Sequence, residues 1–276
     1  MTREAAPVRA PRLPADPLAV GFPDAMRAEW VKLRSLRSTY WSLLAGAVLV
    51  VGLGAVFAAA YGSYYQSASP SERATFDPTT ISLSGVWFGQ LAVGVLGVLT
   101  ITAEYASGTI RPSLAAVPRR GRMLAAKAAV FAAVTLLVGE AASFAAFFVG
   151  QPILALKAPH ASIGDADVLR AVTGAGLYLA ALAVFSVAIG TFIRHTAGAV
   201  TAMVAVVFAV PTVLGALPAS WQRAIAQWLP TNAGSSLWTV QRPAHTFPAW
   251  TGFGVFLGYT AAMLVLTFAL FARRDA

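Results

Sequence analysis

Six long apolar stretches constrain the fold of this chain more than any other feature of its sequence. They are predicted at residues 41–61, 83–103, 128–150, 172–193, 197–217 and 250–272. Each has the roughly 20 residues that a helix needs to cross the hydrocarbon core of a bilayer. Charged residues make up 11% of the chain, against about 25% in a typical soluble domain. The sequence therefore predicts an all-α membrane protein, with six transmembrane helices in one domain that covers residues 24–276.

The lysines and arginines are distributed unevenly between the two sides of these spans. If the N-terminus is cytoplasmic, 15 of the 20 basic residues fall in cytoplasmic segments and 5 in outer segments. Because cytoplasmic loops are enriched in Lys and Arg, we expect both termini in the cytoplasm. The same placement accounts for the net charge of +9, so no nucleic-acid partner is expected.

The N-terminal segment, residues 1–23, is rich in proline and has no continuous apolar core. It is predicted to be a disordered cytoplasmic tail and not a signal peptide. Residues 24–38 repeat apolar and basic positions at helical spacing, which predicts an amphipathic helix at the inner membrane surface, in contact with lipids. A positively charged flank that only sets topology is the alternative. The residues that favour the interfacial helix are Trp30, Lys32, Arg34 and Arg37.

The segment between the fifth and sixth spans, residues 218–249, is long and rich in tryptophan and proline for a loop. Ser220 can begin a short helix that ends before Pro230. We therefore expect a helical extracytoplasmic segment. Two placements remain open, one re-entrant into the bundle and one in an aromatic belt at the membrane interface.

Glycine and proline inside the spans predict local packing features. The pair Gly85 and Gly89 and the pair Gly254 and Gly258 have the four-residue spacing that permits close helix approach. Such pairs also arise by chance in a glycine-rich chain. Pro211 is predicted to kink the fifth span in its outer half.

A compact basic segment, Glu104–Lys127, separates the second and third spans. Gly108 is expected to break the second span, Thr109 to cap a new helix, and Pro118 to end that helix. The result is a short helix over residues 109–117. A cluster of basic side chains follows at its exit: Arg119, Arg120 and Arg122.

This segment resembles the first cytoplasmic loop of type-2 ATP-binding-cassette (ABC) exporter permeases. The basic helix before the first span, the six spans and the helical outer segment match the plan of that family as well, so the resemblance covers about residues 24–272. The residues that the resemblance assigns to coupling are Glu104, Gly108, Thr109, Arg111, Leu114, Pro118, Arg119, Arg120 and Lys127.

The resemblance implies a bacterial inner-membrane (plasma-membrane) subunit that exports an amphipathic or lipid-like substrate. The short helix would be a coupling helix that rests on a separate ABC ATPase subunit, which binds ATP and Mg. Two permease chains would pair, as a homodimer or a paralogous heterodimer. Glu104 would anchor the second span, and Arg111 and Arg120 would meet acidic groups or carbonyls of the ATPase. The sequence that follows the short helix is more basic than the family pattern, so no single arginine is assigned the main contact with the ATPase.

Motifs for chemistry within the chain are missing from the sequence. It has no phosphate-binding loop of the Gly-x-x-x-x-Gly-Lys-Ser/Thr type, so we do not expect it to be an enzyme by itself. Its histidines lie in separate loops, and no metal site is expected; they are His160, His195 and His245.

Glu140 is an ionisable residue near the middle of the third span. Because an embedded carboxylate is costly, it is expected to face the bundle interior or water. It can contact substrate, carry a proton or lie at a dimer interface; alternatively it is a protonated group bonded to a neighbouring helix. Gln90 in the second span is a candidate partner. The alternative functions are therefore a secondary transporter or channel centred on Glu140, and a non-transporting membrane scaffold.

Overall fold

The apolar stretches form long helices in the computed structural model, which describes residues 21–117 and 119–273. The predicted disordered tail lies outside the described residues, except that helix α1 already begins at Phe22. Pro118, the expected end of the short basic helix, also lies outside them. All regular structure in the described residues is helical, which confirms the predicted fold class.

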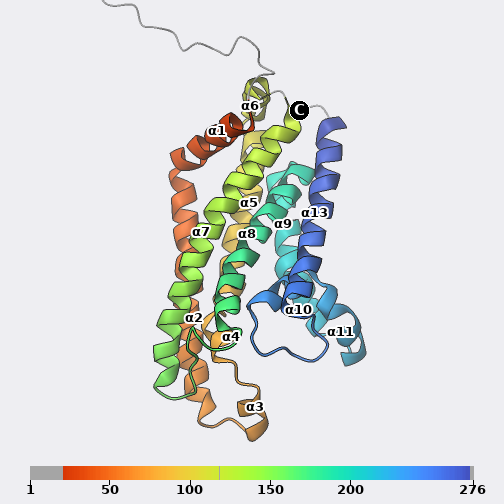
Figure 1. Ribbon diagram of the computed structural model, residues 1–276. Helices are drawn as coiled ribbons and strands as arrows, with labels where there is room; N and C mark the ends of the chain where they lie inside the picture. Colours follow the sequence, from red (N-terminus) through yellow and green to blue (C-terminus); the bar gives the residue numbers. More distant parts are fainter. Residues whose placement is uncertain (1–20, 118, 274–276) are drawn as a thin grey trace, which may run out of the picture.

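Six helical segments are long and apolar enough to cross a membrane. Figure 1 shows them side by side in an elongated bundle. They are α2 (Arg37–Tyr65), α5 (Val86–Ala106), α7 (Arg120–Ala155), α8 (Val168–Ile193), the fifth span Thr196–Gly215 and α13 (Ala249–Arg273). The fifth span consists of α9 (Thr196–Val204), the π-helix η2 (Ala205–Ala209) and α10 (Val210–Gly215).

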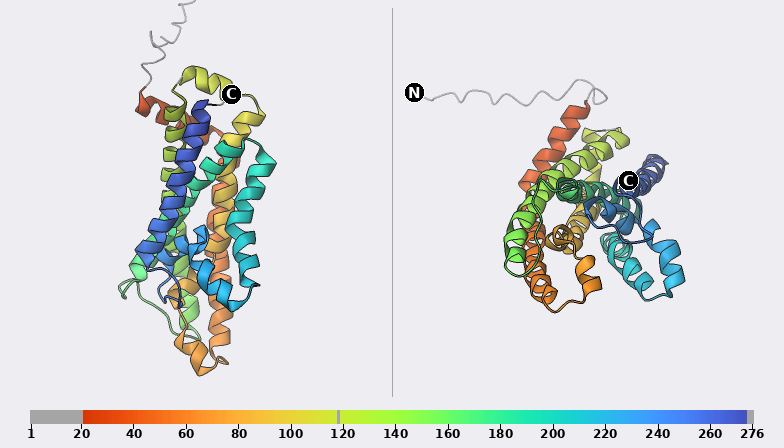
Figure 2. Two further views of the ribbon diagram at one scale, coloured as in Figure 1. Left: turned by 90° about the vertical axis from the view of Figure 1, so that its right-hand side faces the viewer. Right: turned by 60° about the horizontal axis from the view of Figure 1, so that its bottom comes forward.

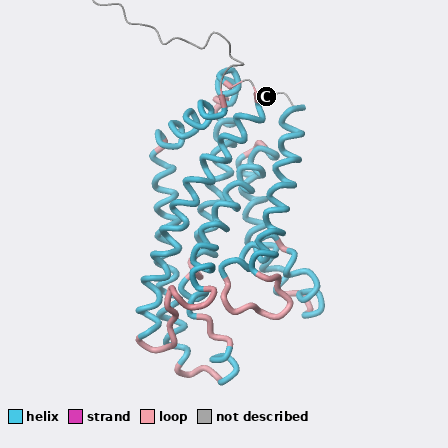
Figure 3. The backbone as a smooth tube through the Cα atoms, in the orientation of Figure 1, coloured by secondary structure: helices cyan, strands magenta, loops and turns pink. Residues whose placement is uncertain are grey.

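Short helices lie at both ends of this bundle. The α6 end carries α1 (Phe22–Ser35) and α6 (Ile110–Ala116), together with the end of α13 (Figures 1 and 2). The opposite end, which we call the α3 end, holds most of the loops (Figure 3). Its short helices are α3 (Pro70–Ala74), α4 (Pro78–Ser82), α11 (Ala219–Ile225), η3 (Ala226–Trp228), α12 (Pro230–Ser235) and η4 (Ser236–Trp238).

Helices α2 and α7 exceed their apolar stretches most. Helix α7 begins at Arg120 and α2 at Arg37, so both start in basic sequence before the predicted spans. Apolar windows mark the part of a helix that suits the bilayer. In α7 the residues before the predicted span include Ala, Leu, Lys and Arg, which continue the helix because they are good helix formers. The basic exit of the short helix is therefore the first turn of α7.

Helix α8 is the centre of the bundle. In its most apolar window 72% of the residues are buried, against 17% for α13. It packs against α7, α5 and α13. The outer spans thus leave broad apolar faces for lipid or for another chain.

The two glycine pairs behave differently. A Cβ atom on Gly85 would lie 2.0 Å from the backbone oxygen of Val50, and one on Gly89 would lie 2.3 Å from the Val50 side chain. These glycines therefore let α2 and α5 approach closely. Gly254 and Gly258 have no other atoms within 4 Å of such a position. Of the two predicted pairs, the first makes a close helix contact within this chain.

The fifth span contains a π-helical turn, Ala205–Ala209, that ends shortly before Pro211, the residue at which a kink is predicted. The backbone N–H of Val210 donates to the carbonyl of Ala205, which closes a π-helical turn. A π-bulge, like a proline, is a common site of helix distortion.

The outer segment divides into an exposed part and a buried part. Trp221 and Trp228, in α11 and η3, are about half exposed. Trp238 in η4 is 1% exposed and contacts Trp87 edge-to-face at 5.2 Å between ring centroids. Asp77 holds the segment from the other side, accepting a 2.8 Å hydrogen bond from the Gln241 backbone N–H. The second half of the segment is therefore packed into the bundle, whereas the tryptophans of the first half remain exposed.

Candidate functional site

The turn between α5 and α6 depends on Gly108, whose φ of +72° suits glycine. Thr109 takes the N-cap position of α6, but its side chain makes no capping hydrogen bond. Its hydroxyl instead lies 2.9 Å from the Ser107 hydroxyl. Ile110 and Val117, at the two ends of α6, are buried against the bundle. The short helix therefore has one fixed face and one exposed face.

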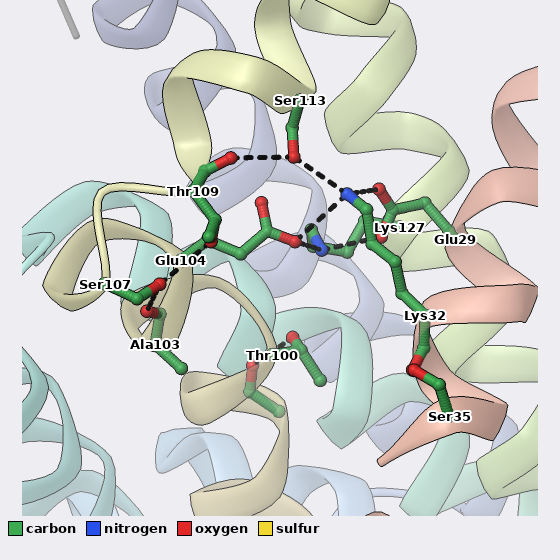
Figure 4. A network of polar contacts seen from close by, with 11 residues as sticks. Glu29, Lys32, Ser35, Thr100, Ala103, Glu104, Ser107, Thr109, Ser113 and Lys127 are labelled. Atoms are coloured by element: carbon green, nitrogen blue, oxygen red, sulfur yellow. Dashed lines mark hydrogen bonds and ion pairs between the residues drawn. The ribbon is translucent and has the colours of Figure 1, made fainter.

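Four charged side chains meet beneath α6, and we call them the Glu–Lys network: Glu29, Lys32, Glu104 and Lys127 (Figure 4). Glu29 accepts hydrogen bonds from the Lys32 ammonium at 2.8 Å and from the Lys127 ammonium at 2.6 Å. One carboxylate oxygen of Glu104 accepts from the same two ammonium groups, at 3.2 and 2.8 Å respectively. The network links α1, α5 and α7.

A hydrogen bond extends the Glu–Lys network to α6. The Lys32 ammonium donates to the Ser113 hydroxyl at 3.0 Å, and that hydroxyl donates to the Thr109 carbonyl at 3.0 Å. Figure 4 shows this connection above the ion pairs. The short helix is therefore joined through side chains to α1 and to two spans.

The Glu–Lys network contains two carboxylates and two ammonium groups, so its formal charges cancel. The side chains of Lys127 and Glu29 are 5% and 6% exposed, so each needs the opposite charge beside it. Burial lowers the pKa of Lys32, but its hydrogen bonds and charge contacts with Glu29 and Glu104 outweigh burial and raise that pKa above the ordinary value of 10.5. Lys32 is therefore charged throughout the physiological pH range.

The coupling residues assigned from sequence separate into two groups. Arg111 and Arg119 are exposed, and Leu114 is half-buried. Arg120 and Arg122 are half-buried and have contacts within the chain. Lys127 was assigned to this loop as well, but it lies inside the bundle at 4% exposure. Its place is in the Glu–Lys network and not on the surface of the α6 end.

Glu29 is the residue of this site that the sequence analysis missed. Its signal was present, since it precedes Lys32 by three residues on a predicted helix, a spacing at which opposite charges meet. The buried face of α1 contains Ala25 and Glu29. The predicted interfacial residues Trp30, Arg34 and Arg37 are exposed, whereas Lys32 points into the network.

The structure does not bring the two polar residues of the spans together. The Gln90 side chain is fully buried, donates to the Trp87 carbonyl at 3.1 Å and accepts from the Tyr178 hydroxyl. Glu140 lies against Gly176 of α8, and one of its carboxyl oxygens has no hydrogen-bond partner among the described residues. Gln90, the candidate partner of Glu140, is instead bonded to Tyr178 and to the Trp87 carbonyl.

This architecture defines a multi-pass helical membrane protein with a charged, α-helical assembly at one end of its bundle. The family model described as ABC-2 family transporter protein matches residues 25–212. The chain belongs to this family and is a membrane permease of an ABC transporter. The matched range contains most of α1, all of α6 and the complete Glu–Lys network. No curated protein matches the chain.

Proposed function

We propose that this permease is the membrane subunit of an ATP-driven exporter that moves an amphipathic or lipid-like substrate out of the cytoplasm. A separate ABC ATPase binds ATP and Mg and docks on α6, and two permease chains assemble around the path of the substrate. The α6 end faces the cytoplasm of a bacterial cell, with both termini on that side. The observation that carries this proposal is the Glu–Lys network beneath α6.

The network supports the proposal because it connects α6 to α1, α5 and α7, so that a displacement of α6 is transmitted to these helices. Ser113 of α6 is bonded to Lys32 of α1. Lys32 and Lys127 are both bonded to Glu104 at the end of α5. Packed interiors deform little and transmit movement. A push on α6 therefore shifts α1, α5 and α7 together, which is the movement that an ATPase has to produce.

The exposed face of α6 supplies the docking groups. Arg111 of α6 and Arg119, which precedes α7, are exposed. Their guanidinium groups suit carboxylates or carbonyls of an ATPase groove. The charge reversals Arg111→Glu and Arg119→Glu, combined, are expected to reduce ATPase recovery in detergent co-purification about tenfold, while membrane insertion is unchanged.

The matched control is the combination of Arg223→Glu and Arg242→Glu, which reverses two exposed arginines in the segment between the fifth and sixth spans. This control is expected to recover ATPase at the level of the natural chain. Equal recovery from both double variants would contradict docking at α6.

A second candidate function, secondary transport centred on Glu140, is favoured by the unpartnered oxygen of that carboxyl group. Under the proposed ATP-driven mechanism, Glu140→Gln is expected to keep export within about twofold, because the amide preserves shape and hydrogen-bonding capacity. ATP-dependent uptake of substrate into inverted vesicles, whose outer face is the cytoplasmic face, checks this. Loss of export at normal protein level, together with loss of pH dependence, would favour the second candidate.

A further inference from the structure

A groove of about 610 Å³ opens at the α6 end between α1, α2 and α5. The Glu–Lys network and a set of hydroxyl groups line one part of it. Leucines line another part: Leu33, Leu36, Leu96 and Leu99. The groove is therefore amphipathic, and α1, one of its walls, is the helix predicted to lie at the inner membrane surface.

Three of the hydroxyl groups in this groove, those of Thr100, Ser107 and Ser35, present acceptors, because their protons are already engaged. Thr100 donates to the Gly97 carbonyl at 2.7 Å, and Ser107 donates to the Ala103 carbonyl at 2.8 Å. Ser35 donates to the Lys32 carbonyl at 2.8 Å. Each hydroxyl oxygen keeps lone pairs that can accept a further hydrogen bond.

The Lys32 ammonium group has no free donor either. The three protons of the Lys32 ammonium are matched by three acceptors, on Glu29, Glu104 and Ser113. The second oxygen of Glu104 is buried and has no hydrogen-bond partner among the described residues, so a headgroup donor that reaches it satisfies an otherwise unpaired acceptor. Figure 4 shows that this oxygen points away from the ammonium groups, toward the side of Ser113 and Thr109. The groove is thus rich in acceptors.

The charge balance of the network selects against ionic headgroups. Its two carboxylates and two ammonium groups cancel. A phosphate would need charged donors, but those of Lys32 are already used, and the side chain of Lys127 is only 5% exposed. A headgroup ammonium would lie beside two other ammonium groups in a partly buried site. An uncharged headgroup that donates hydrogen bonds meets neither obstacle.

We propose that this groove binds a single-chain amphiphile whose headgroup is uncharged and carries several hydrogen-bond donors, such as hydroxyls of a glycerol or sugar. The headgroup contacts Thr100, Ser107 and Glu104, and the chain lies along Leu96 and Leu99. A volume of about 610 Å³ is within the range of pockets for small ligands, roughly 300–1,000 Å³. The step from ligand to cargo rests on the proposed export function, whereas binding is a property of this chain alone.

The test uses the full chain in phosphatidylcholine nanodiscs without ATPase, so that a failure of ATPase docking does not affect it. The probe is a monoacylglycerol with a photoreactive group near the end of its chain. Competitors of equal chain length are an unlabelled monoacylglycerol, a lysophosphatidate and an alkylamine. Mass spectrometry is expected to locate the label on α1, α2 or α5 around the groove, with the unlabelled monoacylglycerol as the strongest competitor.

Two variants connect the labelling to the groove. Thr100→Val removes one acceptor at constant shape and is expected to lower labelling about fivefold, and Leu99→Trp fills the apolar part and is expected to abolish it. The matched control is Thr173→Val, since Thr173 is also half-buried and donates to a carbonyl of its own helix, at 2.9 Å.

Three results would overturn the proposal. The first is stronger competition by the lysophosphatidate or the alkylamine, and the second is a label located outside the groove. The third is equal labelling of the Thr100→Val and Thr173→Val variants.

Discussion

The substitution Glu29→Gln is expected to destabilise the folded chain by about 3 kcal/mol, which is the low end of the cost of breaking a buried ion pair. The low end applies because Lys127 keeps Glu104 as a partner. At about 2–4 °C for each kcal/mol, the midpoint of thermal unfolding in detergent should fall by roughly 6–12 °C. The raised pKa of Lys32 means that its contribution is complete below its ordinary value of 10.5 and is lost as pH rises through the higher folded-state pKa. The measurement at pH 7 therefore sees a fully charged network.

A surface ion pair on the same helix provides the control for this prediction. Arg27 and Asp24 lie 3.8 Å apart with side chains that are 83% and 60% exposed, so Arg27→Gln should change stability by less than about 1 kcal/mol. The double variant Glu29→Gln with Lys127→Met removes one charge of each sign. It should cost less than the sum of the two single variants. Equal behaviour of Glu29→Gln and Arg27→Gln would show that the network does not stabilise the chain.

The second large effect is expected from Gly85→Ala. The new Cβ atom would lie 2.0 Å from the Val50 carbonyl oxygen. Because that oxygen belongs to a helix backbone, rotation of a side chain cannot relieve the collision, and α2 must move away from α5. A cost of about 3 kcal/mol or more is expected. It is measured as a lower unfolding midpoint and a lower yield of monodisperse protein.

A second glycine of the chain, Gly254, provides the control for Gly85→Ala. Gly254→Ala makes the same chemical change in a span, at a site where no other atom lies within 4 Å. It should be neutral or stabilise α13 by about 0.5–1 kcal/mol, because alanine favours helix over glycine. Similar loss in both variants would mean that glycine content, and not the α2–α5 contact, limits stability. Loss at Gly254 alone would indicate a contact outside this chain.

The spans and the turn at Gly108 could be predicted from sequence because their causes are local. An apolar run of about 20 residues selects a membrane helix, and a glycine next to a polar segment favours a chain reversal. The same local reasoning failed for the lengths of α2 and α7, whose basic first turns continue the helix beyond the apolar residues. Hydropathy indicates whether a segment lies in the membrane or in water. It does not give the length of the helix, because polar residues at the ends can continue it.

The network beneath α6 could not be predicted, because its contacts join distant parts of the chain. Glu29 and Lys127 are 98 residues apart, and Lys32 and Glu104 are 72 residues apart. Each side chain alone fits another role, such as a topology signal or a loop contact. Gln90 gives a similar lesson, since its partner Tyr178 is 88 residues away and looks like an ordinary aromatic residue of a span. Such pairings depend on which helix faces meet.

Because its residues are far apart in the sequence, the Glu–Lys network can be completed only late in the synthesis of the chain. The helix that contains Glu29 leaves the ribosome before the segment with Lys127, which follows 98 residues later. Until the third span has been inserted, Glu29 has Lys32 as its neighbour but lacks Lys127. During this stage of synthesis α1 therefore remains undocked, and lipid headgroups and water solvate its charges. Completion of the third span is the event that allows α1 to dock, so a nascent chain that stops before Lys127 should leave this helix accessible to protease.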